Sequence, residues 1–170
     1  GGKYFPTIKP ATEKKIADIA LASAEDVDVA CKSAKAAFDK VWGPMPGRER
    51  GKYIYRVARL LQDRAREFAV AETMDGGKPV KESRDFDVPM AAAHFFYHAG
   101  WADKLEYVAP GRSVAPHGVA GQVIPWNFPL LMLAWKIAPA LAMGNCVVLK
   151  PAETTSITAL KLCEIFQEAG

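Results

Sequence analysis

Two short apolar runs flank a longer apolar segment near the end of this 170-residue chain. The runs, residues 118–124 and 146–149, are partly β-branched, which is typical of buried strands. The segment between them, residues 130–143, is long enough to form a crossover helix, and parallel strands need a connection of that kind. We therefore expect a βαβ unit, and with it an α/β fold that contains a parallel sheet.

Polar residues follow both expected strands. Asn127 comes shortly after the first strand, and Lys150 and Glu153 come at the end of the second. In sheets of this type the ligand crevice lies beyond the carboxyl ends of the strands. We therefore expect these three side chains to project where a small molecule binds.

The residues before this unit indicate a hairpin followed by helices. Two extended segments, residues 7–9 and 16–20, are separated by turn-forming residues, which predicts the hairpin. Ser23 with Asp26 three residues later resembles a capping box at a helix start. Helical spacing of apolar residues predicts helices over residues 23–39, 48–74 with a bend, 80–105 with a break at Pro89, and 156–169.

These patterns divide the chain into three parts. Residues 1–106 form the hairpin and a helical layer, residues 107–117 form a strand-like linker with two prolines and a glycine, and residues 118–170 form a βαβα unit. Two strands leave an exposed sheet edge. We expect that edge, and the helical faces around Phe95 and Trp135, to require a cover.

The composition fits a folded domain, because half of the residues are hydrophobic and 24% are charged. The net charge is +3, and the basic side chains are mixed with acidic ones along the chain, so we expect no nucleic-acid partner. Lys136 and Pro139 interrupt the longest apolar run, and we expect no membrane span. Three cysteines without a C-x-x-C pair, and a start without a secretory leader, favour a reducing compartment, with the cytoplasm as the expected location.

Several segments with uncommon residues occur in an order that resembles the aldehyde dehydrogenase superfamily. The resemblance runs from Tyr4 to Gly170 and rests on the segments DGGKP (75–79), AGWADK (99–104), PWNFP (125–129) and VLKPAE (148–153). It implies the oxidation of an aldehyde to a carboxylic acid with NAD as cofactor. It also implies that this chain is the N-terminal part of a Rossmann-like, parallel-sheet NAD-binding domain, with the catalytic domain outside the chain.

Asn127 lies between Pro125 and Pro129, which restrict the backbone on both sides. A positioned amide N–H is suited to an oxyanion hole, where negative charge develops on a substrate oxygen. From the residues alone, a turn asparagine that bonds to its own backbone is the better interpretation. The resemblance favours the oxyanion role and makes Asn127 the candidate catalytic residue.

The resemblance also implies a set of cofactor contacts. It places Lys150 and Glu153 on the adenosine ribose, where a carboxylate favours NAD over a 2′-phosphorylated cofactor. The alternative is a solvated ion pair near a helix start. The chain has no G-x-G-x-x-G fingerprint. The implied cofactor-binding residues are Val123, Ile124, Pro125, Trp126, Asn127, Lys150, Ala152 and Glu153.

Phe128, Met132 and Trp135 are spaced so that they share one face of a helix. Such a stripe is more often part of a core. The resemblance implies that these positions border an aldehyde tunnel, which would favour hydrophobic or aromatic aldehydes. His94 and His98 have the spacing of a helical metal pair but lack a third ligand, so we expect no metal site.

The expected chemistry needs a thiolate nucleophile and a glutamate that activates water. The resemblance places both beyond residue 170, so we expect the 170 residues alone to be inactive. Residues 107–117 would correspond to a shortened oligomerisation arm of a homo-oligomer. Two alternatives remain open, namely a free-standing, non-catalytic binding or assembly subunit, and a semialdehyde dehydrogenase that uses phosphate or coenzyme A.

Overall fold

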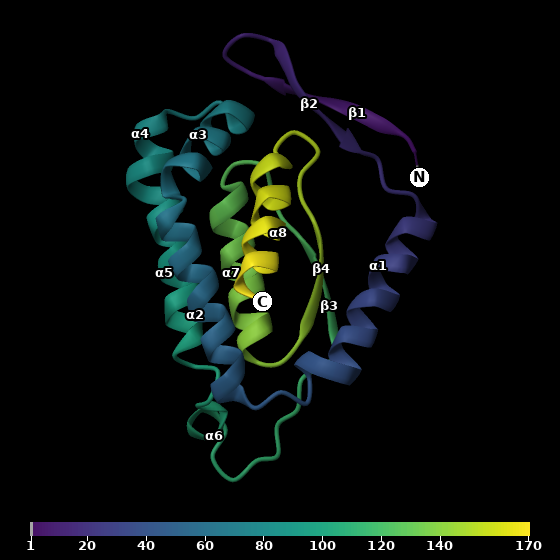
Figure 1. The fold of residues 1–170 in the computed structure, drawn as a ribbon, viewed down its shortest axis with the longest axis vertical. Helices are drawn as coiled ribbons and strands as arrows, with labels where there is room; N and C mark the ends of the chain where they lie inside the picture. Colours follow the sequence, from purple (N-terminus) through teal and green to yellow (C-terminus); the bar gives the residue numbers. More distant parts are fainter. Residues whose placement is uncertain (1) are drawn as a thin grey trace.

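The computed structural model describes residues 2–170 (Figure 1). Strands β1 (Tyr4–Lys9) and β2 (Lys14–Ala20) form an antiparallel hairpin, as the sequence predicts. The first helix, α1 (Ala24–Ala37), begins at the predicted capping box, in which Ser23 and Asp26 bond each other's backbone N–H groups. A π-helical turn, η1 (Phe38–Trp42), extends this helix.

Helices make up most of the remaining chain. The predicted bend between residues 48 and 74 occurs at Arg64, and the helix that follows ends at Gly77, whose left-handed backbone (φ 78°) suits glycine. The elements up to residue 108 are α2 (Gly47–Asp63), α3 (Ala65–Gly76), α4 (Val80–Glu82), the π-helical turn η2 (Ser83–Asp87), α5 (Val88–Ala99) and α6 (Leu105–Val108).

The predicted βαβ unit is confirmed. Strands β3 (Val119–Val123) and β4 (Cys146–Lys150) pair in parallel, with Val119 opposite Cys146 and Val123 opposite Lys150. Helix α7 (Pro129–Ala142) connects them, and α8 (Ile157–Ala169) follows. Their boundaries lie within one or two residues of the predicted ones.

The helices enclose the small sheet in layers (Figure 1). Helix α1 lies on one face, while α7 and α8 lie on the other, with α2 and α5 packed outside them. The core forms mainly between α2, α5, α7 and α8, because the apolar stripes of these helices face one another. Its largest fully buried side chains include Ile54, Leu61, Phe68, Phe95, Leu130, Leu133, Leu162 and Ile165. Each contributes roughly 2 kcal/mol of hydrophobic stabilisation.

Three expectations about residues 80–117 are wrong. Residues 107–117 form no strand, because Pro110 and Pro116 cannot donate to a ladder and no described strand lies beside them. The helix predicted to reach residue 105 ends earlier, because α5 stops at Ala99 and the chain turns at Gly100. Pro89 causes no break, since the Val88 N–H bonds to the Ser83 carbonyl in the preceding π-helical turn and Pro89 falls in the first turn of α5.

The expected uncovered face around Phe95 is also absent. Phe95 is fully buried, and its ring packs edge-on against Phe166 of α8. Trp135 does remain partly exposed, as expected. Within residues 2–170, no helix is long and apolar enough to cross a membrane.

Candidate functional site

The carboxyl ends of β3 and β4 meet at one edge of the sheet. Val123 lies opposite Lys150, and the Ile124 N–H donates to the Lys150 carbonyl at 3.2 Å. The loop of residues 124–128 and the turn of residues 151–156 therefore leave the sheet side by side. This arrangement confirms the prediction that both polar segments emerge at the same edge.

The loop after β3 presents most of its residues to solvent. Val123, Pro125, Trp126 and Asn127 are exposed, whereas Ile124 is only 2% exposed and packs into the core. Ile124 therefore anchors the loop in the core. No residue of the described chain forms a hydrogen bond with the Asn127 side chain. The turn interpretation, in which Asn127 bonds to its own backbone, is not what the structure shows.

Lys150 and Glu153 form an ion pair at this edge, and both side chains are exposed. The Lys150 ammonium donates to the Glu153 carboxylate, which holds the pKa of Glu153 below its usual value. Helix α8 begins at Ile157, so Glu153 lies before its first turn. An exposed pair of opposite charges at a strand end is available to polar groups of a ligand, such as sugar hydroxyls.

Hydrogen bonds within its own backbone and to α3 stabilise the turn after β4. The buried Ala152 carbonyl accepts bonds from the Thr155 N–H (3.2 Å) and the Ser156 hydroxyl (3.0 Å). Asp75, at the end of α3, accepts from the Ile157 N–H at 2.8 Å and from the Thr7 hydroxyl at 2.7 Å. These bonds fasten the turn to the hairpin and to α3, so the position of the edge is fixed.

The predicted stripe of Phe128, Met132 and Trp135 lies along the first half of α7. Phe128 precedes the helix and its carbonyl accepts the Met132 N–H at 2.8 Å. Met132 packs partly against the core, whereas Trp135 is 47% exposed and its ring lies 5.5 Å from that of His94 on α5. Met132 therefore contributes to the core, whereas Trp135 and His94 form a partly exposed aromatic surface.

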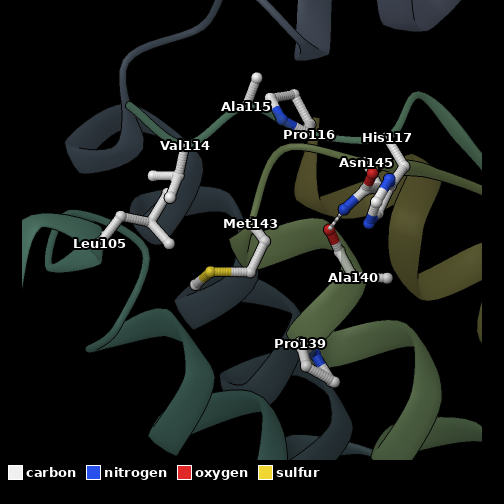
Figure 2. Close-up of a pocket in the computed structure, with 9 residues that line it drawn as sticks. All are labelled: Leu105, Val114, Ala115, Pro116, His117, Pro139, Ala140, Met143 and Asn145. Carbon is white, nitrogen blue, oxygen red and sulfur yellow. Dashed lines mark hydrogen bonds between the residues drawn. The ribbon is translucent and has the colours of Figure 1, made fainter. Parts of the chain in front are cut away.

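The described chain also has two hollows with largely apolar linings. One, of about 380 Å³, lies beside α6 and the end of α7 (Figure 2). There Asn145 accepts from the Gly118 N–H at 3.1 Å and donates to the Ala140 carbonyl at 3.3 Å, so its amide is occupied by structural bonds. The other is a groove of about 680 Å³ beneath α1, with Val147, Val148 and Leu149 of β4 in its wall. The second hollow reaches Leu149 and Pro151, next to the strand edge. The strand edge carries the exposed polar side chains of Asn127, Lys150 and Glu153, and for that reason it is the candidate site.

Comparison with known proteins identifies the family of the chain. A family model described as the aldehyde dehydrogenase family matches residues 1–170. The chain belongs to the aldehyde dehydrogenase family. It is 47% identical over 178 residues to aldehyde dehydrogenase family 2 member B4, mitochondrial, of Arabidopsis thaliana, covering 99% of this chain and 33% of that protein.

Further relatives give the same result. Benzaldehyde dehydrogenase, mitochondrial, of Antirrhinum majus is 44% identical over 178 residues, with 99% of this chain and 33% of that protein covered. An NAD+ complex structure of aldehyde dehydrogenase from Bacillus cereus aligns with a TM-score of 0.93 at 40% identity, covering 99% of this chain and 36% of that one. The chain therefore has the fold of the N-terminal NAD-binding portion of aldehyde dehydrogenases and spans about a third of the length of these relatives.

In this member of the aldehyde dehydrogenase family, a buried polar cluster also lies behind the candidate site. Glu72 of α3, Lys78 and Asp87 are largely buried, and Lys78 Nζ lies 2.5 Å from Asp87 Oδ2. The sequence analysis did not select these residues. A signal was present, because Phe68, Glu72 and Asp75 share the core face of α3, where a carboxylate is unusual.

The fully buried Glu72 has an altered protonation equilibrium. Burial raises the pKa of Glu72 from 4.5 to about 7, against the opposing effects of the Thr158 hydroxyl, the Leu130 N–H and Lys78, and the negative charge of Asp87 adds to the rise. The folded protein therefore retains a proton that the unfolded chain releases between pH 4.5 and 7. We expect folding stability to fall as pH rises through this range, by about 3 kcal/mol in total.

Urea denaturation of the full-length protein at pH 5 and pH 8 measures this effect. The Glu72→Gln variant keeps the shape and an acceptor for the Leu130 N–H, and it should lose most of the decline. An equal decline in the variant and the unaltered protein would show that other groups cause it.

Proposed function

We propose that this chain is the N-terminal part of an NAD-dependent aldehyde dehydrogenase that oxidises an aldehyde to a carboxylic acid. The observation that supports this most strongly is the strand edge. In a chain of this family, an exposed Asn127 amide without an internal partner lies on the loop beside the Lys150–Glu153 pair. The thiol nucleophile and the glutamate base would come from sequence beyond residue 170.

Asn127 has the chemistry of an oxyanion donor. When a thiolate attacks an aldehyde carbon, negative charge develops on the carbonyl oxygen, and an amide N–H directed at that oxygen stabilises it. The donor must be positioned before the reaction begins. Pro125 and Pro129 restrict the loop on either side of Asn127, and no bond within residues 2–170 competes for its amide.

The residues at the edge fit an adenosine ribose. Glu153 can accept bonds from the ribose hydroxyls, and Lys150 can donate to them. The exposed residues Val123, Pro125 and Trp126 would line the cleft, with the buried residues Ile124 and Ala152 supporting it from the core. NAD bound there would be the oxidant, because it accepts a hydride from the substrate carbon.

Glu153 should determine cofactor choice, because its carboxylate repels a 2′-phosphate. In the full-length enzyme, Glu153→Ser should narrow the preference for NAD over NADP, measured as the ratio of kcat/KM for the two cofactors. Glu168→Ser, a change of the same type at the other end of α8, provides the control and should leave the ratio unchanged. Equal kcat/KM for both cofactors in the unaltered enzyme would refute the role of Glu153.

We also propose roles for the remaining parts. Residues 1–106 support the site, residues 107–117 form a short arm in a homo-oligomer, and residues 118–170 carry the cofactor and oxyanion groups. Phe128, Met132 and Trp135 form one wall of an aldehyde tunnel, which suits hydrophobic or aromatic aldehydes. Three free thiols, two of them exposed, agree with a reducing compartment such as the cytoplasm or the mitochondrial matrix.

The proposal is tested by adding propanal, hexanal or benzaldehyde with NAD to the full-length protein. We expect NADH and the matching acid, without added phosphate or coenzyme A. If activity required phosphate or coenzyme A, the enzyme would transfer the acyl group to that acceptor and would not hydrolyse the thioester. The absence of NADH with every aldehyde would contradict the proposed function.

A further inference from the structure

Lys78 has two neighbours that together fix its ammonium group. It pairs with Asp87 at 2.5 Å and lies 4.1 Å from the centre of the Phe128 ring. The Lys78 side chain is 14% exposed and that of Asp87 is 1% exposed. Because Asp87 is buried, its charge requires a partner. If Lys78 moved away, Asp87 would be left as an unpaired buried charge, which is unfavourable. The cation is therefore held against the ring of Phe128.

Phe128 is the residue that follows Asn127. Its carbonyl begins the hydrogen bonding of α7, and two residues later the Leu130 N–H bonds to the buried Glu72 at 3.4 Å. The Asn127 amide has no hydrogen-bond partner within residues 2–170, so its direction depends on the backbone to which it is attached. On the C-terminal side, that backbone is held by three largely buried polar residues: Glu72 of α3, Asp87 of η2, and Lys78 between α3 and α4.

We propose that Lys78 is a positioning residue for Asn127, acting through a cation–π contact with Phe128. The contact holds the Phe128 ring, and with it the loop that directs the Asn127 amide at the substrate oxygen. A shift of about 1 Å at a reacting group can reduce turnover about 100-fold, so a contact one residue away affects the rate without touching the substrate. This role rests on the proposed function.

The test is a mutant cycle in the full-length enzyme. Lys78→Met combined with Asp87→Asn removes the cation without leaving a buried charge unpaired, and Phe128→Leu removes the ring. The kcat is measured with saturating NAD and benzaldehyde, together with NAD affinity and melting temperature. Lys161→Met is the matched control, because Lys161 is also a partly buried lysine in an ion pair, but pairs with Glu67 away from the site.

We expect the Lys78 and Asp87 double variant to lower kcat by about 10-fold to 100-fold with unchanged NAD affinity. In the Phe128→Leu background the same changes should have little further effect, because the contact is already lost. Lys161→Met should keep kcat. An unchanged kcat in the double variant, or losses that multiply in the triple variant, would overturn the positioning role.

A crystal structure of the double variant gives a readout that does not depend on turnover. We expect the loop of residues 125–128 to move or lose order, and an unmoved loop would refute the role of Lys78. Failure of the proposed function gives a different result, since the unaltered enzyme would then form no NADH with benzaldehyde, propanal or hexanal.

Discussion

Replacing Asn127 with Ala in the full-length enzyme should lower kcat by about 100-fold to 1000-fold, the usual loss for one oxyanion donor. NAD affinity should change little, because the ribose contacts lie with Lys150 and Glu153. The melting temperature should also be preserved, since the exposed Asn127 amide forms no hydrogen bond within residues 2–170. Steady-state kinetics, an NAD titration and a thermal melt measure the three quantities.

Asn145→Ala is the matched control, because Asn145 is the other asparagine of the chain. Its amide bonds to Gly118 and Ala140, so its loss should cost about 1–3 kcal/mol of stability while kcat stays near normal. If Asn127→Ala instead abolished NAD binding and preserved turnover at saturation, Asn127 would shape the cofactor cleft and would not stabilise the oxyanion.

Residues 1–170 expressed alone should form no NADH with any aldehyde, although Asn127, Lys150 and Glu153 are present. Without the nucleophile no thiohemiacetal forms, and an oxyanion donor has no charge to stabilise. The isolated segment should also self-associate, because β4 has one neighbouring strand and a largely apolar groove of about 680 Å³ lies beneath α1.

An activity assay and light scattering on purified residues 1–170 test both statements. Aldehyde-dependent NADH formation by this segment would contradict the assignment of the nucleophile to later sequence. A monodisperse monomer that melts cooperatively would favour the free-standing binding module over a part of a longer enzyme.

The parts of the fold that follow local rules were predictable. The capping box at Ser23 depends on residues three apart, and Gly77 ends α3 because glycine adopts a left-handed backbone easily. The βαβ unit follows from two apolar runs and the length between them. The shared edge of Asn127, Lys150 and Glu153 follows from the parallel pairing, without any knowledge of side-chain contacts.

The parts that depend on distant contacts were not predictable. Phe95 is buried because α8 places Phe166 against it, and no local pattern shows that pairing. Lys78 and Phe128 are fifty residues apart in the sequence and meet only when the loop before α7 packs behind α3. The Lys150–Glu153 pair was one of two interpretations, and the structure shows the pair while its role toward a cofactor stays a prediction.

A crystal structure of the full-length protein with bound NAD would test the central proposal most directly. We expect the adenosine ribose hydroxyls to lie within hydrogen-bond distance of Glu153 and Lys150, with the Asn127 amide facing the space where an aldehyde oxygen would bind. NAD bound elsewhere, for example in the groove beneath α1, with the edge of β3 and β4 unchanged, would contradict it.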